Sequence, residues 1–160
     1  PTDLAALDAQ ERELVWPFFT ADHAWFICTG LRDILHKMGQ HAVIDVSLVA
    51  SHRVLAHTAT NGTVPDNDRW VERKRRTVVR WGHSSWYMRQ KYKGDEKAFR
   101  ERSGLGEEEG RGYAIHGGAF PVRVTGVEGV VAVVVVSGLK QEMDHQIVVE
   151  VLRAALKDEK

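Results

Sequence analysis

The chain has 160 residues, 22 Lys+Arg against 22 Asp+Glu, a single cysteine and 43% apolar residues. This length fits one domain, and an apolar, electrically neutral composition is globular rather than disordered. Neutrality argues against a protein that mainly coats nucleic acid or an acidic membrane, and a lone cysteine excludes an intramolecular disulfide. We therefore expect a cytoplasmic domain over residues 1–160, without a secretory signal, a membrane span or a nucleic-acid partner.

The N-terminal part predicts a helix followed by a short strand. Residues 2–13 form the predicted helix, an N-terminal extension to the domain with Thr2 as its N-cap. The apolar run 14–19 contains Pro17, which cannot donate to a strand ladder, so this strand belongs at a sheet edge.

A second helix and a β-hairpin follow. Thr20 is a suitable N-cap and Gly39 a suitable C-terminal stop for a helix whose predicted apolar face contains Trp25, Leu31, Ile34, Leu35 and Met38. The aliphatic and β-branched runs 42–51 and 52–59 are nearly contiguous, which predicts a hairpin that turns near Ser51.

The middle of the chain is helical and basic. Asp66 can cap a helix that reaches Trp81, with an expected apolar stripe of Trp70, the Lys74 stem, Val78 and Trp81. Another helix is expected over residues 86–102, and the glycine-rich stretch 104–121 is expected to be irregular.

Two strands and a helix complete the predicted fold. Residues 121–127 and 129–138 read as strands, and the second is apolar at nearly every position, so it should be central and buried on both faces. Residues 140–157 form the last predicted helix. Because hairpin connections outnumber crossovers, we expect an α+β fold with a central antiparallel sheet of about five strands flanked by helices.

The eight histidines do not predict a structural metal site. His52 and His57 lie in one predicted strand at an odd separation, which places them on opposite faces. No His-x-x-x-His or Cys-x-x-Cys spacing occurs, so we expect no metal site. Haem needs only one axial ligand, so this spacing argument leaves haem open as a cofactor.

Two segments are candidate sites. In the first, His116 precedes Gly117 and Gly118, whose N–H groups can form an anion-binding nest, although a plain turn into a strand explains the same pattern. In the second, a strand passes into a helix between Ser137 and His145. Here Asp144 is explained by the helix dipole alone and His145 by partial burial, and no Gly-x-Ser-x-Gly elbow supports a nucleophilic Ser137.

Positive charge is concentrated in one segment. Residues 66–102 hold 12 Lys+Arg against 6 Asp+Glu, a net charge of +6 that the rest of the chain balances. Arg73 and Arg76 recur at helical spacing within it. A helix face that is solvated or that contacts another subunit would explain these arginines. A binding site for carboxylates, phosphates or haem propionates would also explain them.

Four motifs in order carry a family resemblance. They are PDND-RW-x-x-RKR (Pro65 to Arg75), WGHSSWY (Trp81 to Tyr87), Y-x-x-HGGAFP (Tyr113 to Pro121) and VSGL-x-Q-x-x-DH (Val136 to His145). Over residues 13–156 the chain resembles a cytosolic branch, found in bacteria and fungi, of the haem-degrading-domain superfamily that contains the HbpS-like and GlcG-like proteins.

The resemblance implies a profilin-like fold with a five-stranded antiparallel sheet, homo-oligomers, and binding of haem or a related ligand. It matches a Gly-Gly-x-Pro turn to Gly117, Gly118 and Pro121. It also matches a strand-to-helix Ser-Gly pair with its following acid to Ser137, Gly138 and Asp144.

Three functions remain open from the sequence. The first is a homo-oligomer that binds a small anionic ligand or haem through Gly117, Gly118, Pro121, Ser137, Gly138, Arg73 and Arg76. The second is an enzyme acting on a small anionic metabolite, with His116 or His145 as base, Asp144 as a further candidate, and glycine N–H groups that stabilise an oxyanion. The third is a non-catalytic oligomeric scaffold or partner-binding protein.

Overall fold

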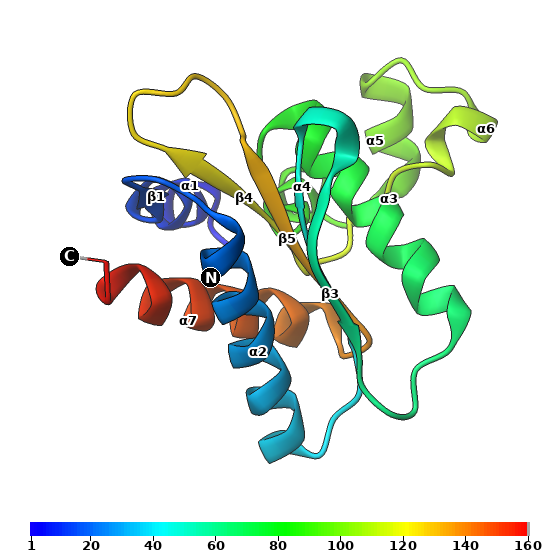
Figure 1. Cartoon of the computed structure of the whole chain (residues 1–160). Helices are drawn as coiled ribbons and strands as arrows, with labels where there is room; N and C mark the ends of the chain where they lie inside the picture. The colour runs from blue at the N-terminus through cyan, green and yellow to red at the C-terminus, as the bar shows by residue number, and fades with distance from the viewer. Residues whose placement is uncertain (160) are drawn as a thin grey trace.

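A five-stranded sheet with helices on both faces forms the centre of the molecule (Figure 1). The computed structural model describes residues 1–159. The strands lie in the order β1-β4-β5-β2-β3 and comprise β1 (Val15–Trp16), β2 (Val43–Leu48), β3 (Val54–Ala59), β4 (Ala119–Val124) and β5 (Ala132–Ser137). The α-helices are α1 (Leu4–Glu13), α2 (Ala21–Met38), α3 (Pro65–Trp81), α4 (Ser85–Lys91), α5 (Glu96–Arg102), α6 (Glu107–Gly110) and α7 (Gln141–Lys157). The predicted α+β fold with five strands and flanking helices is confirmed.

One strand pair departs from the expected antiparallel pattern. β4, β5, β2 and β3 pair antiparallel, whereas β1 lies parallel to β4, with Val15 opposite Arg123. The sheet is therefore mixed. The predicted edge position of the first strand is confirmed, as is the turn at Ser51, whose φ is +57°. His52 lies in that turn, not in the strand where we expected it.

β5 is buried on both faces, as its composition predicts. Ala132, Val134 and Val136 belong to the core under α2 and α7, whereas Val133 and Val135 belong to the core that α3 covers. Alternate side chains of a strand point to opposite faces, so one valine-rich strand supplies both cores. α3 and α7 thereby face each other across one end of this strand.

The caps of α2 are those the sequence predicts. The Thr20 hydroxyl accepts a hydrogen bond from His23 N–H, and Gly39 ends the helix with a φ of +64°. The predicted apolar face is only partly right, because Trp25 is 61% exposed and the buried face consists of Ala24, Ile27, Cys28, Leu31 and Leu35. Trp25 follows Ala24 directly and so lies about 100° from that face.

The expected single helix over residues 86–102 is wrong. α4 ends before Lys93 and Gly94, which both have positive φ, and Asp95 caps the separate helix α5. The stretch expected to be irregular also contains the one-turn helix α6.

The N-terminal ends of α1 and α3 also differ from expectation. Asp3, not Thr2, caps α1 by accepting a hydrogen bond from Ala6 N–H. Asp66 lies inside α3, which has Pro65 in its first turn and no side-chain cap from Asp66. None of the helices described in residues 1–159 has the length and apolar content needed to cross a membrane.

Candidate functional site

A cavity of about 310 Å³ lies between α3 and the start of α7. We call it the His116 cavity. Its walls come from three parts of the chain that are far apart in sequence, namely α3, the loop before β4, and the β5–α7 junction. The lining residues are Asn67, Trp70, Lys74, His116, Ser137, Gly138, Leu139, Gln141 and Asp144.

The Gly117-Gly118 turn brings the loop before β4 against α7. A Cβ on Gly117 would collide with the carbonyl oxygen of Gln141, and one on Gly118 would collide with that of Val136. Gly118 also has a φ of +135°, which L side chains rarely adopt. Gly117 N–H donates to Gln141 Oε1 at 3.3 Å, so close packing accounts for both glycines and this N–H already has a partner.

A buried ion pair closes the floor of the cavity. Lys74 Nζ lies 3.1 Å from Asp144 Oδ2 and donates to the carbonyl oxygen of Val136 at 3.1 Å. The two side chains are 4% and 1% exposed. Asp144 also accepts hydrogen bonds from the N–H groups of Leu139 (3.0 Å) and Gly138 (3.4 Å), so it fixes the turn that leads into α7.

Burial shifts both pKa values of this pair towards the neutral forms. It raises the pKa of Asp144 to about 6, although the ammonium of Lys74 and the two backbone N–H groups oppose the change. Burial likewise lowers the pKa of Lys74 below its usual value. A carboxyl with this pKa can exchange a proton near neutral pH, which is a property of acid–base residues as well as of structural ion pairs.

His116 forms one wall of the cavity. Its ring lies edge-on to Trp70, with centroids 4.8 Å apart. Its Nδ1 atom is buried and makes no hydrogen bond, although Oε1 of Glu96 lies 3.8 Å away. Burial lowers the pKa of His116. The negative charge of Glu96 opposes this shift, and the positive charges of Arg89, Lys74 and Arg73 add to it. Burial thus favours the neutral imidazole.

His145 faces a different cavity. It is buried in α7, and its Nε2 lies 2.9 Å from Gln10 Oε1 of α1. Burial lowers its pKa to about 4. A second cavity of about 540 Å³ has His145, Gln10, Trp86 and Pro1 among its lining residues, and His116 lies outside that lining. The two candidate histidines thus do not meet.

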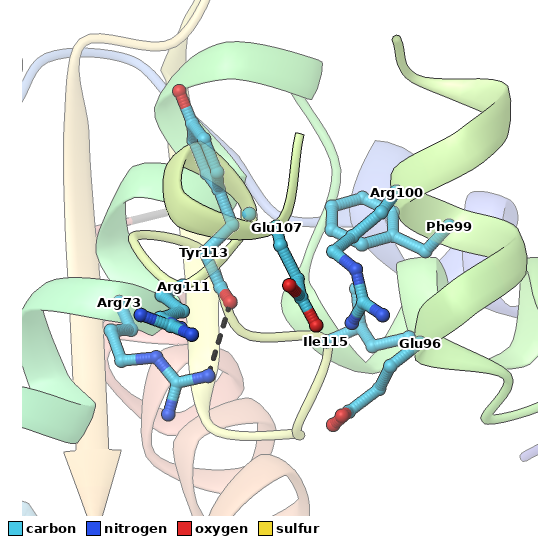
Figure 2. Close-up of a pocket in the computed structure, with 9 residues that line it drawn as sticks. Arg73, Glu96, Phe99, Arg100, Glu107, Arg111, Tyr113 and Ile115 are labelled. Atoms are coloured by element: carbon cyan, nitrogen blue, oxygen red, sulfur yellow. Dashed lines mark hydrogen bonds between the residues drawn. The ribbon is translucent and has the colours of Figure 1, made fainter. Parts of the chain in front are cut away.

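The remaining predicted site residues divide between the His116 cavity and other places. Ser137 and Gly138 line the cavity. Pro121 lies inside β4, opposite Val133, and outside the cavity lining. Arg73 and Arg76 project from α3 towards the segment before β4 and line other hollows, one of which Figure 2 shows.

Five lining residues were not among the predicted site residues. Asn67, Trp70 and Lys74 recur along α3 at intervals of three and four, so they share one helix face, while Leu139 and Gln141 lie where β5 passes into α7. The sequence marked Trp70 and Lys74 as parts of an apolar stripe. A lysine in such a stripe is the signal that could have indicated a buried acidic partner.

One group of side chains has the spacing of metal ligands. Asp8, Glu11 and His83 place one ligand atom each within 4.8 Å of one another, where α1 meets α4. The carboxylate of Glu11 already accepts hydrogen bonds from Ser84 N–H and, at 2.7 Å, from His83 Nδ1, and Asp8 pairs with Arg12. These bonds fasten α1 to α4 and give the cluster a structural role.

Comparison with known proteins identifies relatives across nearly the whole chain. A UPF0303 protein of Streptomyces avermitilis is 41% identical over 152 residues, which is 95% of this chain and 90% of that protein. A UPF0303 protein of Psychromonas ingrahamii is 37% identical over 154 residues, covering 96% and 93% of the two chains.

Solved structures share the fold. The crystal structure of the Ybr137w protein superposes with a TM-score of 0.87 at 31% identity, covering 98% of this chain and 89% of that one. HbpS gives a TM-score of 0.65 at 20% identity, covering 86% and 89%, and a PduOC:heme complex gives 0.63 at 12%, covering 86% and 94%. The family model described as "Haem degrading protein HbpS-like" matches residues 19–153. The chain therefore belongs to the HbpS-like haem-degrading protein family, as the sequence motifs predicted.

Proposed function

We propose that this protein binds a small planar anionic ligand, of which haem is the test case, in the His116 cavity. One observation carries the proposal: His116, whose burial favours the neutral imidazole and whose Nδ1 makes no hydrogen bond, lines an open cavity together with the indole ring of Trp70. Membership of an HbpS-like haem-degrading family and the heme complex of a protein with the same fold, PduOC, support the same ligand class.

The residues present fit a haem. A neutral imidazole is the form of histidine that ligates iron, and burial favours that form of His116. Trp70 lines the cavity and offers an aromatic ring to a planar ligand. The guanidinium of Arg73, 4.3 Å from the centroid of that ring, offers a cation for a carboxylate group. Bound haem would supply the redox and oxygen chemistry of its iron, while this chain's residues hold and orient it.

Titration with haem tests the proposal. Purified protein should shift the Soret band of haem at micromolar concentrations, and His116→Ala should abolish the shift. His36→Ala, which removes an exposed histidine from the last turn of α2, should bind haem as the wild type does. A wild-type protein that leaves the Soret band unchanged, or a His116→Ala variant with unchanged binding, would refute the proposal.

We also infer that the protein assembles with copies of itself. Phe18, Trp25 and Phe26 are 52%, 61% and 56% exposed, and aromatic side chains are enriched in subunit interfaces. Light scattering at micromolar concentration should show an oligomer that Trp25→Asp dissociates or weakens. A monomeric wild-type protein would contradict this inference.

A further inference from the structure

Two adjoining cavities lie beside α3, separate from the His116 cavity. The first, which we call the arginine cavity, has a volume of about 150 Å³ and is lined by Arg69, Glu72, Arg73, Arg76, Arg111 and Gly112. Four guanidinium groups and one carboxylate give this lining a formal charge of +3. The second, the aromatic cavity of about 190 Å³, shares Arg73 and Arg111 with the first.

The aromatic cavity has apolar as well as charged walls. Its lining includes Phe99, Tyr113 and Ile115, together with Arg100 and two glutamates. In Figure 2 the guanidinium groups of Arg73 and Arg111 lie on one side of this hollow and that of Arg100 on the other.

Most of these arginines have hydrogen-bond donors to spare. Arg76 pairs with Glu72 at 3.2 Å, but no carboxylate of residues 1–159 lies within 4.0 Å of a guanidinium nitrogen of Arg69, Arg73 or Arg111. The guanidinium of Arg73 lies 4.3 Å from the Trp70 ring centroid and donates to the carbonyl oxygen of Tyr113 at 3.3 Å. Its Nε atom is buried without a partner. Arg73 is thus held in place by contacts that leave its charge unneutralised.

Two glycines make room for the cluster. A Cβ on Gly112 would lie 2.8 Å from Nη1 of Arg76, and one on Gly110 would collide with Cδ of Arg100. Neither glycine is among the residues with positive φ. The glycines on either side of Arg111 are therefore explained by the space that the side chains of Arg100 and Arg76 need, and not by the backbone conformation.

This arrangement points to a binding site for the phosphoryl group of a phosphate monoester. Like charges held together oppose folding, so a cluster of arginines is best satisfied by an anion placed among them. Guanidinium forks match phosphate oxygens, and a tetrahedral dianion offers three oxygens to several donors at once, whereas a carboxylate offers two and a single charge. The adjoining aromatic cavity can receive the esterified group.

Calorimetric titration in a phosphate-free buffer of about 0.05 M ionic strength tests this site, with inorganic phosphate and phenyl phosphate as probes. Both probes should bind, and phenyl phosphate should bind at least as tightly as inorganic phosphate. Arg111→Gln should weaken both about tenfold or more, because it removes a charge-assisted contact. Gly112→Ala should weaken both by displacing the guanidinium of Arg76, whose Nη1 would lie 2.8 Å from the new Cβ. Without phosphate, Arg111→Gln should unfold at the same temperature as the wild type or higher, since it relieves repulsion.

The control variant is Arg53→Gln, which removes the same charge at the exposed tip of the β2–β3 hairpin and should bind both probes as the wild type does. Absence of binding by the wild type, or equal weakening in Arg53→Gln and Arg111→Gln, overturns the site. Binding of benzoate as tight as that of phenyl phosphate overturns the phosphoryl assignment. Exclusion of phenyl phosphate while inorganic phosphate binds overturns the monoester assignment.

Discussion

Replacing Lys74 by methionine isolates the charge of the buried ion pair. Methionine keeps an unbranched stem that packs in the same space, but it removes the ammonium that neutralises Asp144. Both side chains are almost fully buried, so the variant leaves an uncompensated carboxylate in the protein interior. We expect the free energy of unfolding to fall by about 3–5 kcal/mol at pH 8.

The pH dependence of this loss gives a sharper test. Loss of the Lys74 charge raises the pKa of Asp144 further above the value of about 6 that it has in the wild type. A carboxyl group whose pKa is higher in the folded than in the unfolded state stabilises the fold while it is protonated. This stabilisation is complete below the unfolded-state pKa and is lost as the pH rises through the folded-state pKa. Between pH 6 and the higher pKa of the variant, its stability should therefore fall relative to the wild type by about 1.4 kcal/mol per pH unit.

Urea unfolding followed by tryptophan fluorescence at pH 6, 7 and 8 measures both effects. Lys97→Met is the matched control, because the Lys97 side chain is 77% exposed and its Nζ lies 4.0 Å from Oε1 of the exposed residue Glu101. Its loss should change the free energy of unfolding by about 0.5 kcal/mol or less. A Lys74→Met loss below about 1 kcal/mol at pH 8, or one that does not vary with pH, would show that the pair is not buried as described.

Three further predictions concern the glycine turn, a buried histidine and the cysteine. In urea titrations, Gly118→Ala should lower the free energy of unfolding much more than Gly126→Ala does. Both glycines have a positive φ, but only the Cβ at position 118 would collide with another atom, since no atom lies within 4 Å of a Cβ at position 126. Equal losses in the two variants would rule out the collision. The His145 ring should stay neutral in NMR titrations until about pH 4, and its contribution to stability, complete above about pH 6.5, should be lost as the pH falls through 4. A His145 titration near pH 6.5 would contradict its burial. Burial raises the pKa of the Cys28 thiol to about 11. A disulfide reagent at pH 8 should therefore label Cys28 in the native protein at least about a hundredfold more slowly than in the urea-unfolded protein. Comparable labelling rates would refute this prediction.

Local signals in the sequence predicted most of the fold. The caps Thr20 and Gly39 act through their own side chain or backbone, so their roles can be read without knowing the rest of the molecule. The exposure of Trp25 could not be read in this way, since an aromatic next to a buried face satisfies a loose helical pattern equally well. The break between α4 and α5 did have a signal, because Gly94 followed by Asp95 is a helix stop followed by an N-cap.

The candidate site was harder to predict because its parts meet only after folding. Lys74 and Asp144 are 70 positions apart, and neither residue alone indicates that the other neutralises it. His116 was singled out through the glycines beside it, yet the structure gives those glycines a packing role against α7. The separation of His116 from His145 follows from the orientation of α7, which periodicity alone does not fix.

The outer edge of β4 bears on how a valine-rich sheet avoids pairing with strands of other molecules. Strand edges with free N–H groups recruit strands from other molecules and so start aggregation. On the β4 side, the carbonyl oxygens of Gly118 and Val122 accept hydrogen bonds from the N–H groups of Val136 and Val131, respectively. The odd-numbered residues of β4 therefore direct their N–H groups away from β5. Along that edge Ala119 N–H donates to the Ser85 hydroxyl, Pro121 has no N–H, and Arg123 lies against β1. A proline and one serine thus leave an incoming strand almost no donors, and Pro121→Val should increase the tendency of the protein to form fibrils.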